Sequence, residues 1–130
     1  MTPSEAVKMS LARYASFHGR ARRSEYWSRT LFHVLAIVLA MVVSYRVMLA
    51  IPALGILVYS IVVFGTAVQH MAVSVRRLHD LDRTGWWYLF GCIPPLGTVL
   101  LLLLFCTAGT RGPNRFGADP KAGVSIARST

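Results

Sequence analysis

The sequence predicts an all-α membrane protein with about three transmembrane helices, and two observations point to that class. The 130 residues are 55% hydrophobic, with a mean hydropathy of +0.52, whereas soluble domains are roughly 45–50% apolar. Residues 30–45, 47–75 and 84–110 contain no charged side chain. A helix needs about 20 apolar residues to cross the hydrocarbon core, so each run can supply one span. The length allows a single domain, residues 1–130.

The residues before the first apolar run predict either an interfacial helix or a soluble helical lead-in. Within residues 4–17, the apolar side chains of Val7, Leu11 and Tyr14 share one helical face. Lys8 can lie on the opposite face, as in helices that rest on a membrane surface. The apolar face is small, so the sequence leaves both alternatives open.

The apolar runs predict spanning helices at 25–46, 51–75 and 86–107. A single helix over residues 30–75 would be about 69 Å long, so this segment must fold back. Pro52 favours the start of a helix and places the turn just before it. Pro94-Pro95 removes two backbone donors from the third helix and predicts a kink or break there.

The distribution of Lys and Arg predicts that the N-terminus and a charged loop, residues 76–85, are cytoplasmic. Six of these cations lie at or before the start of the first helix, one in the first turn, three in the charged loop and four in a polar tail, residues 108–130. Three crossings place that tail outside. A re-entrant third segment would place it inside with a stronger charge bias, but each half would then hold only about ten residues. We therefore expect a full crossing.

Two similar sequences precede apolar runs on the predicted cytoplasmic side: RSEYW at 23–27 and RTGWW at 83–87. Ser24 and Thr84 can cap the emerging helices, and the aromatic side chains suit the membrane–water interface. The predicted interfacial aromatics are Tyr26, Trp27, Trp86, Trp87 and Tyr88. Arginines at this level can bind lipid phosphates or a protein partner. The candidates for that role are Arg20, Arg22, Arg23, Arg76, Arg77 and Arg83.

Two aspartates in the charged loop predict ion pairs, because a plain lipid-binding patch would omit acidic residues. Arg76 and Arg77 precede Asp80 by four and three residues, which is within helical reach. The basic run GRARR, residues 19–23, ends at the same membrane face. We therefore expect Arg22 or Arg23 to dock onto Asp80 or Asp82. The predicted ion-pair network comprises Arg22, Arg23, Arg76, Arg77, Asp80 and Asp82.

Three blocks of the chain, in this order, resemble a known family. They are FHGRARRSEYW at 17–27, VRRLHDLDRTGWWYL at 75–89 and GTRGPNRFGADP at 109–120. The pattern is similar to that of the domain of unknown function 805 family, the YhaH-like bacterial inner-membrane proteins. Ala118 stands where that family frequently has proline. The resemblance implies a protein of the bacterial inner membrane and implies no activity, substrate or cofactor.

Five residues, in two groups, are candidates for chemical sites. His79, Asp80 and Asp82 are residue types used for metal binding or acid–base catalysis, but no third strong ligand is nearby in the sequence and no HExxH or paired CxxC pattern occurs. We favour a salt-bridged loop and expect neither metal nor cofactor. His33 and His70 fall at similar depth in the first two helices, which predicts an interhelical polar pair or a proton path.

The leading functional prediction is a non-enzymatic membrane protein that binds anionic lipid or a partner through residues 19–23 and 76–83. The alternative is a small transporter or channel, which would require a homo-oligomer because three helices leave little room for a pore. A membrane enzyme centred on His79, Asp80 and Asp82 ranks third. Nucleic acid is not expected as a ligand, because the basic residues lie between apolar runs.

Overall fold

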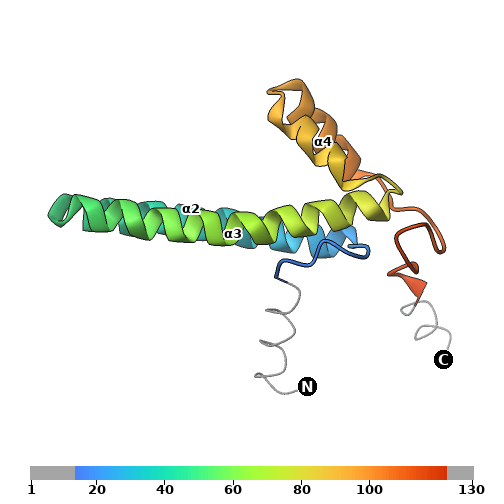
Figure 1. Ribbon diagram of the computed structural model, residues 1–130, viewed down its shortest axis with the longest axis horizontal. Helices are drawn as coiled ribbons and strands as arrows, with labels where there is room; N and C mark the ends of the chain where they lie inside the picture. The colour runs from blue at the N-terminus through green and yellow to red at the C-terminus, as the bar shows by residue number, and fades with distance from the viewer. Residues whose placement is uncertain (1–13, 123–130) are drawn as a thin grey trace, which may run out of the picture. The chain divides into compact units, whose positions relative to one another are not determined.

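The computed structural model describes residues 14–122 and is helical through the apolar part of the chain (Figure 1). The elements in order are α2 (Arg23–Ala50), α3 (Pro52–Asp80), the 3-10 helix η1 (Gly85–Cys92) and α4 (Leu96–Cys106). The predicted all-α membrane class is confirmed. Residues 4–13 of the candidate N-terminal helix lie outside the described residues, and residues 14–17 form a turn followed by irregular chain.

Helices α2 and α3 have the length and composition of membrane spans. They contain 28 and 29 residues, which corresponds to about 42 Å each, more than the roughly 30 Å of a hydrocarbon core. Ile51 alone separates them, and Pro52 occupies the first position of α3, where a missing N–H costs nothing. The predicted turn is therefore confirmed, but α2 continues past its expected end at residue 46 to Ala50.

Helix α3 continues to Asp80, so residues 76–80 of the predicted loop are helical. Asp82 ends the helix in a left-handed conformation, φ 57°. The Arg83 N–H donates to Leu78 O at 2.9 Å and the Asp82 N–H donates to His79 O at 3.1 Å. These two bonds form a Schellman-type cap, in which the left-handed position usually holds Gly or Asn. This cap turns the chain sharply at the end of α3.

The third apolar segment is not the single kinked helix 86–107 that the sequence predicts. It consists of η1 and α4, with residues 93–95 between them (Figure 1). Pro94 and Pro95 explain the break, because neither has an N–H with which to continue a helix. The two limbs pack together: a Cβ at Gly97 would overlap the Phe90 carbonyl. We call Gly85–Cys106 the short hairpin.

Contacts between residues divide the chain into two compact units. Among the described residues, the two-helix unit holds 14–15 and 28–71, and the polar unit holds 16–27 and 72–122. The polar unit contains a buried apolar cluster in which the rings of Tyr26 and Phe105 lie 4.5 Å apart between centroids. The other buried members of the cluster are Ala21, Val73, Leu78 and Leu101. This cluster joins the start of α2, the end of α3 and α4.

Candidate functional site: a buried arginine–aspartate network

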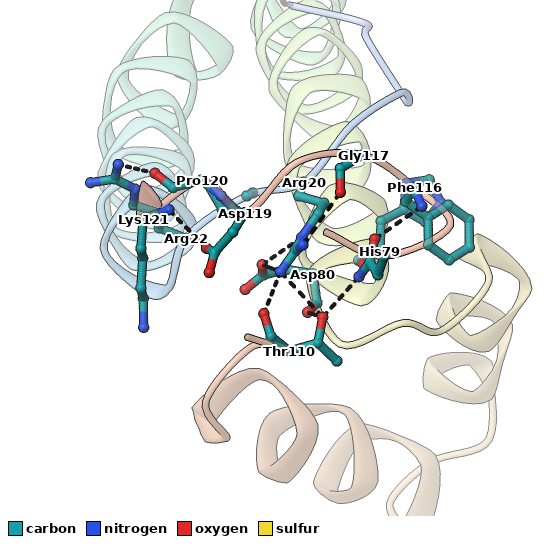
Figure 2. A network of polar contacts seen from close by, with 12 residues as sticks. Arg20, Arg22, His79, Asp80, Thr110, Phe116, Gly117, Asp119, Pro120 and Lys121 are labelled. Atoms are coloured by element: carbon teal, nitrogen blue, oxygen red, sulfur yellow. Dashed lines mark hydrogen bonds and ion pairs between the residues drawn. The ribbon is translucent and has the colours of Figure 1, made fainter. Parts of the chain in front are cut away.

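Asp80, at the C-terminal end of α3, binds two arginines in the interior of the polar unit. Figure 2 shows one of them, Arg20, beside the carboxylate. The Arg20 guanidinium donates to Oδ1, with Nε at 3.0 Å and Nη2 at 2.9 Å. Arg77, one helical turn before Asp80, donates to Oδ2. The side chains are buried, with 1% exposure for each arginine and 3% for Asp80. Buried charges are tolerated only when paired and hydrogen-bonded, as they are here.

Arg20 also holds the segment that follows α4. Its guanidinium donates to the carbonyl oxygens of Thr110 and Gly112, both at 2.6 Å, and to Gly117 O at 3.5 Å. The Thr110 N–H in turn donates to the Asp80 main-chain oxygen at 2.8 Å. Asp80 therefore contacts this segment directly through its backbone and indirectly through Arg20.

Residues 114–117 form a tight turn that packs on the last turn of α3. Asn114 Nδ2 donates to His79 O at 2.9 Å, and Asn114 Oδ1 accepts the Phe116 N–H at 2.9 Å. The Phe116 ring stacks on His79, with centroids 4.0 Å apart and an interplanar angle of 3°. His79 Nδ1–H donates to Gly19 O at 3.0 Å. The imidazole thus joins the segment before α2 to the segment after α4.

Asp119 closes the same segment with hydrogen bonds to backbone N–H groups. Its carboxylate accepts from Lys121 at 2.9 Å and from Gly112 at 3.0 Å. Both hydrogen bonds, of which the one from Lys121 has the larger effect, favour the ionised carboxylate and hold the pKa of Asp119 below its usual value. Arg22 donates to the neighbouring Pro120 carbonyl (Figure 2). We call residues 107–121 the docked segment.

Two arginines also bind the C-terminal end of α4. Arg77 donates to Thr107 O and to Phe105 O, the latter at 3.4 Å, and Arg23 donates to Cys106 O at 3.2 Å. The last carbonyls of a helix have no intrahelical partner and carry partial negative charge. Cations at this position satisfy them, so the interaction fixes the end of α4 within the polar unit.

The predicted docking of Arg22 or Arg23 onto Asp80 or Asp82 is wrong. Ala21 N–H donates to Arg76 O at 3.0 Å, which aligns the chain before α2 along α3 and places Arg20 beside Asp80. Arg22 and Arg23 bind main-chain carbonyls instead.

The remaining ion pairs follow the prediction only in part. Arg77 binds Asp80 as expected, but Arg76 binds Glu25 at 3.0 Å instead of Asp80. Asp82 binds Arg115 at 3.3 Å, in an exposed pair.

Three of the six candidate lipid-binding arginines are unsuited to that role. Arg20, Arg76 and Arg77 are buried, because their guanidinium groups are needed inside the polar unit. Arg22 is half-buried, whereas Arg23 and Arg83 are exposed. Only these last three can offer charge to a headgroup without unfolding the network.

The predicted aromatic belt also needs one correction. Tyr26 is 3% exposed because it packs in the buried cluster, whereas Trp86 is 77% exposed. Trp27 is exposed, and Trp87 and Tyr88 are half-buried. Ser24 lies within α2 and Thr84 precedes η1 without a side-chain capping bond, so neither acts as the expected cap.

His33 and His70 lie together in the two-helix unit, as predicted. Their rings stack with centroids 4.7 Å apart and an interplanar angle of 18°. The contact is a ring stack rather than a hydrogen bond between the histidines. Thr30 Oγ1 lies 3.3 Å from His70 Nε2 and adds a third polar group.

His79, Asp80 and Asp82 do not converge on one point, since each has separate partners. His79 faces Gly19 and Phe116, and the two aspartates bind different arginines. Across residues 14–122, the structure contains no group of three or more His, Cys, Asp or Glu side chains suited to a metal ion.

Sequence reasoning missed the central position of Arg20 and most of the docked segment. The sequence indicates only that residues 112–117, GPNRFG, can join residues 76–83 in one site if both segments face the same compartment. The signal for Arg20 was weak, because three arginines lie within residues 20–23 and any of them could have reached Asp80. Thr110 and Asp119 carried no signal that spacing alone could reveal.

Comparisons with known proteins identify the family of the chain. A family model described as "Protein of unknown function (DUF805)" matches residues 14–118. The chain belongs to the DUF805 family. It is 42% identical to the inner membrane protein YhaI of Escherichia coli (strain K12) over 113 residues, which are 87% of this chain and 92% of that protein. It is also 42% identical to the inner membrane protein YhaH of the same strain over 114 residues, covering 85% and 92%. No solved structure matches this DUF805 protein. Together with α2 and α3, these relatives support an inner-membrane location.

Proposed function

We propose that this DUF805 protein is non-enzymatic and binds anionic lipid headgroups through exposed cations of the polar unit. The observation that carries the proposal is the division of the arginines into two groups. The buried ones are bound to Asp80 and Glu25. Among the exposed ones, Arg115 is paired with Asp82, whereas Arg23, Arg83 and Arg111 have no carboxylate partner among residues 14–122. Exposed cations near a membrane surface attract anionic lipids at about 1 kcal/mol each.

Arg83 has the geometry expected of a residue at the membrane–water interface. Its guanidinium carbon lies 4.5 Å from the centroid of the Trp87 ring, and the neighbouring Trp86 is largely exposed. A cation held over an indole ring is stabilised by the ring quadrupole while its N–H groups stay free for phosphate. Arg111 is exposed as well and follows α4. Both sides of the short hairpin thus carry a cation.

The charge distribution supports a cytoplasmic position for the polar unit and for the N-terminus. Cytoplasmic loops of inner-membrane proteins carry an excess of Lys and Arg, and the polar unit contains most of the cations of the chain. This positive charge favours anionic lipid of the cytoplasmic leaflet as the ligand.

The proposal is tested in nanodiscs of phosphatidylcholine with and without phosphatidylglycerol. Anionic lipid should raise the melting temperature of the wild-type chain, and the double variant Arg83→Gln with Arg111→Gln should lose most of that increment. Arg115→Gln is the control, because it removes one charge from an exposed side chain of the polar unit that is already paired with Asp82, and it should leave most of the increment intact. An equal increment in the double variant and the wild type would rule out headgroup binding by these cations.

A second candidate function, an oligomeric transporter or channel, is favoured by one observation. His33, His70 and Thr30 form a polar cluster within apolar helices, and such residues can mark an ion path. Size analysis in mild detergent separates the two proposals. A stable ring with solute flux in liposomes, abolished by His33→Leu with His70→Leu, would favour transport, whereas a monomer without flux favours lipid binding.

A further inference from the structure

Both ends of the short hairpin are tied to the same buried network. On the entry side, the Schellman-type cap binds Arg83 N–H to Leu78 O at 2.9 Å, directly after α3. On the exit side, Arg77 binds the Thr107 carbonyl and Thr110 N–H donates to Asp80 O. Groups joined by direct hydrogen bonds lie in one compartment. The chain must therefore return after α4 to the side on which it left α3.

Neither limb of the short hairpin is long enough to cross a bilayer. Helix η1 has 8 residues and α4 has 11, so their lengths are about 16 Å each. The hydrocarbon core is about 30 Å thick. Each limb can reach about half of that distance, which is the depth of one leaflet.

The turn between the limbs suits an apolar environment. An unpaired backbone N–H costs several kcal/mol in hydrocarbon. Ile93 N–H donates to Phe90 O at 3.1 Å, and Pro94 and Pro95 have no N–H to satisfy. Gly97 N–H donates to Ile93 O at 2.8 Å, so the hydrogen bonding resumes as α4 begins. The break therefore leaves few backbone donors that require water.

The surface of the short hairpin is strongly apolar. Residues 84–110 contain no charged side chain, and Leu96, Leu103 and Ile93 are 78%, 62% and 56% exposed. An apolar surface of this extent marks an interaction site. Its borders carry the exposed Trp86 and the cation Arg83 on the entry side, which is the pattern of a membrane–water interface. The chemistry fits the acyl chains of phospholipids.

We propose that Gly85–Cys106 is a re-entrant hairpin that inserts into one leaflet and contacts its acyl chains, so that the docked segment returns to the side of Asp80. The chain then crosses the membrane twice, through α2 and α3, instead of three times. Charge supports this arrangement: all cations except Arg46 come to lie on one side, which satisfies the positive-inside rule better than three crossings do.

The topology is tested with single cysteines in a Cys92→Ser, Cys106→Ser background. Ser24→Cys reports the start of α2, Ile51→Cys reports the turn between α2 and α3, and Ala118→Cys reports the docked segment; all three positions are exposed. A membrane-impermeant maleimide is applied to right-side-out and to inverted vesicles. We expect Ser24→Cys and Ala118→Cys to react in the same vesicles and Ile51→Cys in the opposite ones. Reaction of Ala118→Cys together with Ile51→Cys would overturn the re-entrant hairpin.

Insertion is tested separately with a nitroxide at Leu96→Cys. Collisions with oxygen should exceed collisions with a water-soluble nickel complex, as expected within acyl chains. A nitroxide that collides mainly with the nickel complex would show that the hairpin lies in water and would overturn the contact with the leaflet. Neither readout depends on headgroup charge, so either result is independent of the proposed binding of anionic lipid.

Discussion

The substitution Asp80→Asn should release the docked segment from the polar unit. It removes the carboxylate shared by Arg20 and Arg77, whose side chains are each 1% exposed, and leaves both cations buried without an anion. Breaking a buried ion pair on one side costs about 3–5 kcal/mol. The Asn side-chain oxygen can still accept one hydrogen bond, and Arg20 keeps its bonds to Thr110 and Gly112. We therefore expect a cost of about 3 kcal/mol, the lower end of that range.

Hydrogen exchange of the Thr110 amide measures this cost directly. That N–H donates to the Asp80 main-chain oxygen, which the substitution leaves in place. A loss of about 3 kcal/mol raises its opening constant by roughly 100-fold.

The matched control for Asp80→Asn is Asp82→Asn. Asp82 pairs with Arg115 in an exposed bridge, with side-chain exposures of 44% and 59%. Exposed bridges contribute about 1 kcal/mol at most. If the two variants accelerated exchange equally, the account of Asp80 as the central anion would be refuted.

Three further predictions concern the same unit. Gly109→Ala should also free the docked segment, because a Cβ at this position would overlap the Asp80 carboxylate; protection of the Thr110 amide equal to wild type would contradict this contact. A fluorophore at Ala118→Cys should be immobile above pH 3.8, the ordinary pKa of an Asp carboxyl, and should gain mobility as the pH falls through the lower folded-state pKa of Asp119. The reason is that a group with a depressed pKa stabilises the fold only while it is ionised. Persistence of the same transition in Asp119→Asn would exclude this assignment. Tyr26→Ala should destabilise the unit by about 3 kcal/mol in thermal unfolding, because it leaves a cavity beside Phe105 in the buried cluster. An effect as small as that of Trp27→Ala, at an exposed position, would show that the cluster is not closely packed.

The spans were predictable because hydropathy is a local property. Most of α2 and α3 consists of two runs without charged side chains, residues 30–45 and 47–75, and Pro52 marks the junction of the helices. Pro94 and Pro95 likewise indicated an interruption. The extent of that interruption was not predictable, because it depends on α4 packing back on η1 near Gly97.

The sequence predicted which residue types form the arginine–aspartate network, but not which arginine pairs with which aspartate. Crowded arginines beside two aspartates indicated ion pairs, and the helical spacing of Arg77 and Asp80 identified one of them. The choice of Arg20 depends on the backbone bond from Ala21 to Arg76. That bond joins residues 55 positions apart, which no local pattern encodes.

The docked segment was beyond sequence reasoning for a similar reason. Asn114, Phe116 and Asp119 acquire their roles only when residues 107–121 fold onto the end of α3. Their side chains are ordinary for a turn, so composition indicated a loose tail. Three crossings would also have placed this tail on the opposite side from Asp80.

The central claim is that the Arg20–Asp80 pair holds the docked segment on the polar unit. A double-mutant cycle with Arg20→Gln and Asp80→Asn tests it, with exchange of the Thr110 amide as the readout for each variant. Contacting residues in one network show coupling of about 0.5–3 kcal/mol, and for this buried pair we expect at least about 1.5 kcal/mol. The opening constant of the Thr110 amide in the double variant should therefore be much smaller than the sum of the two single free-energy effects predicts. Additive effects, with coupling near zero, would contradict the account.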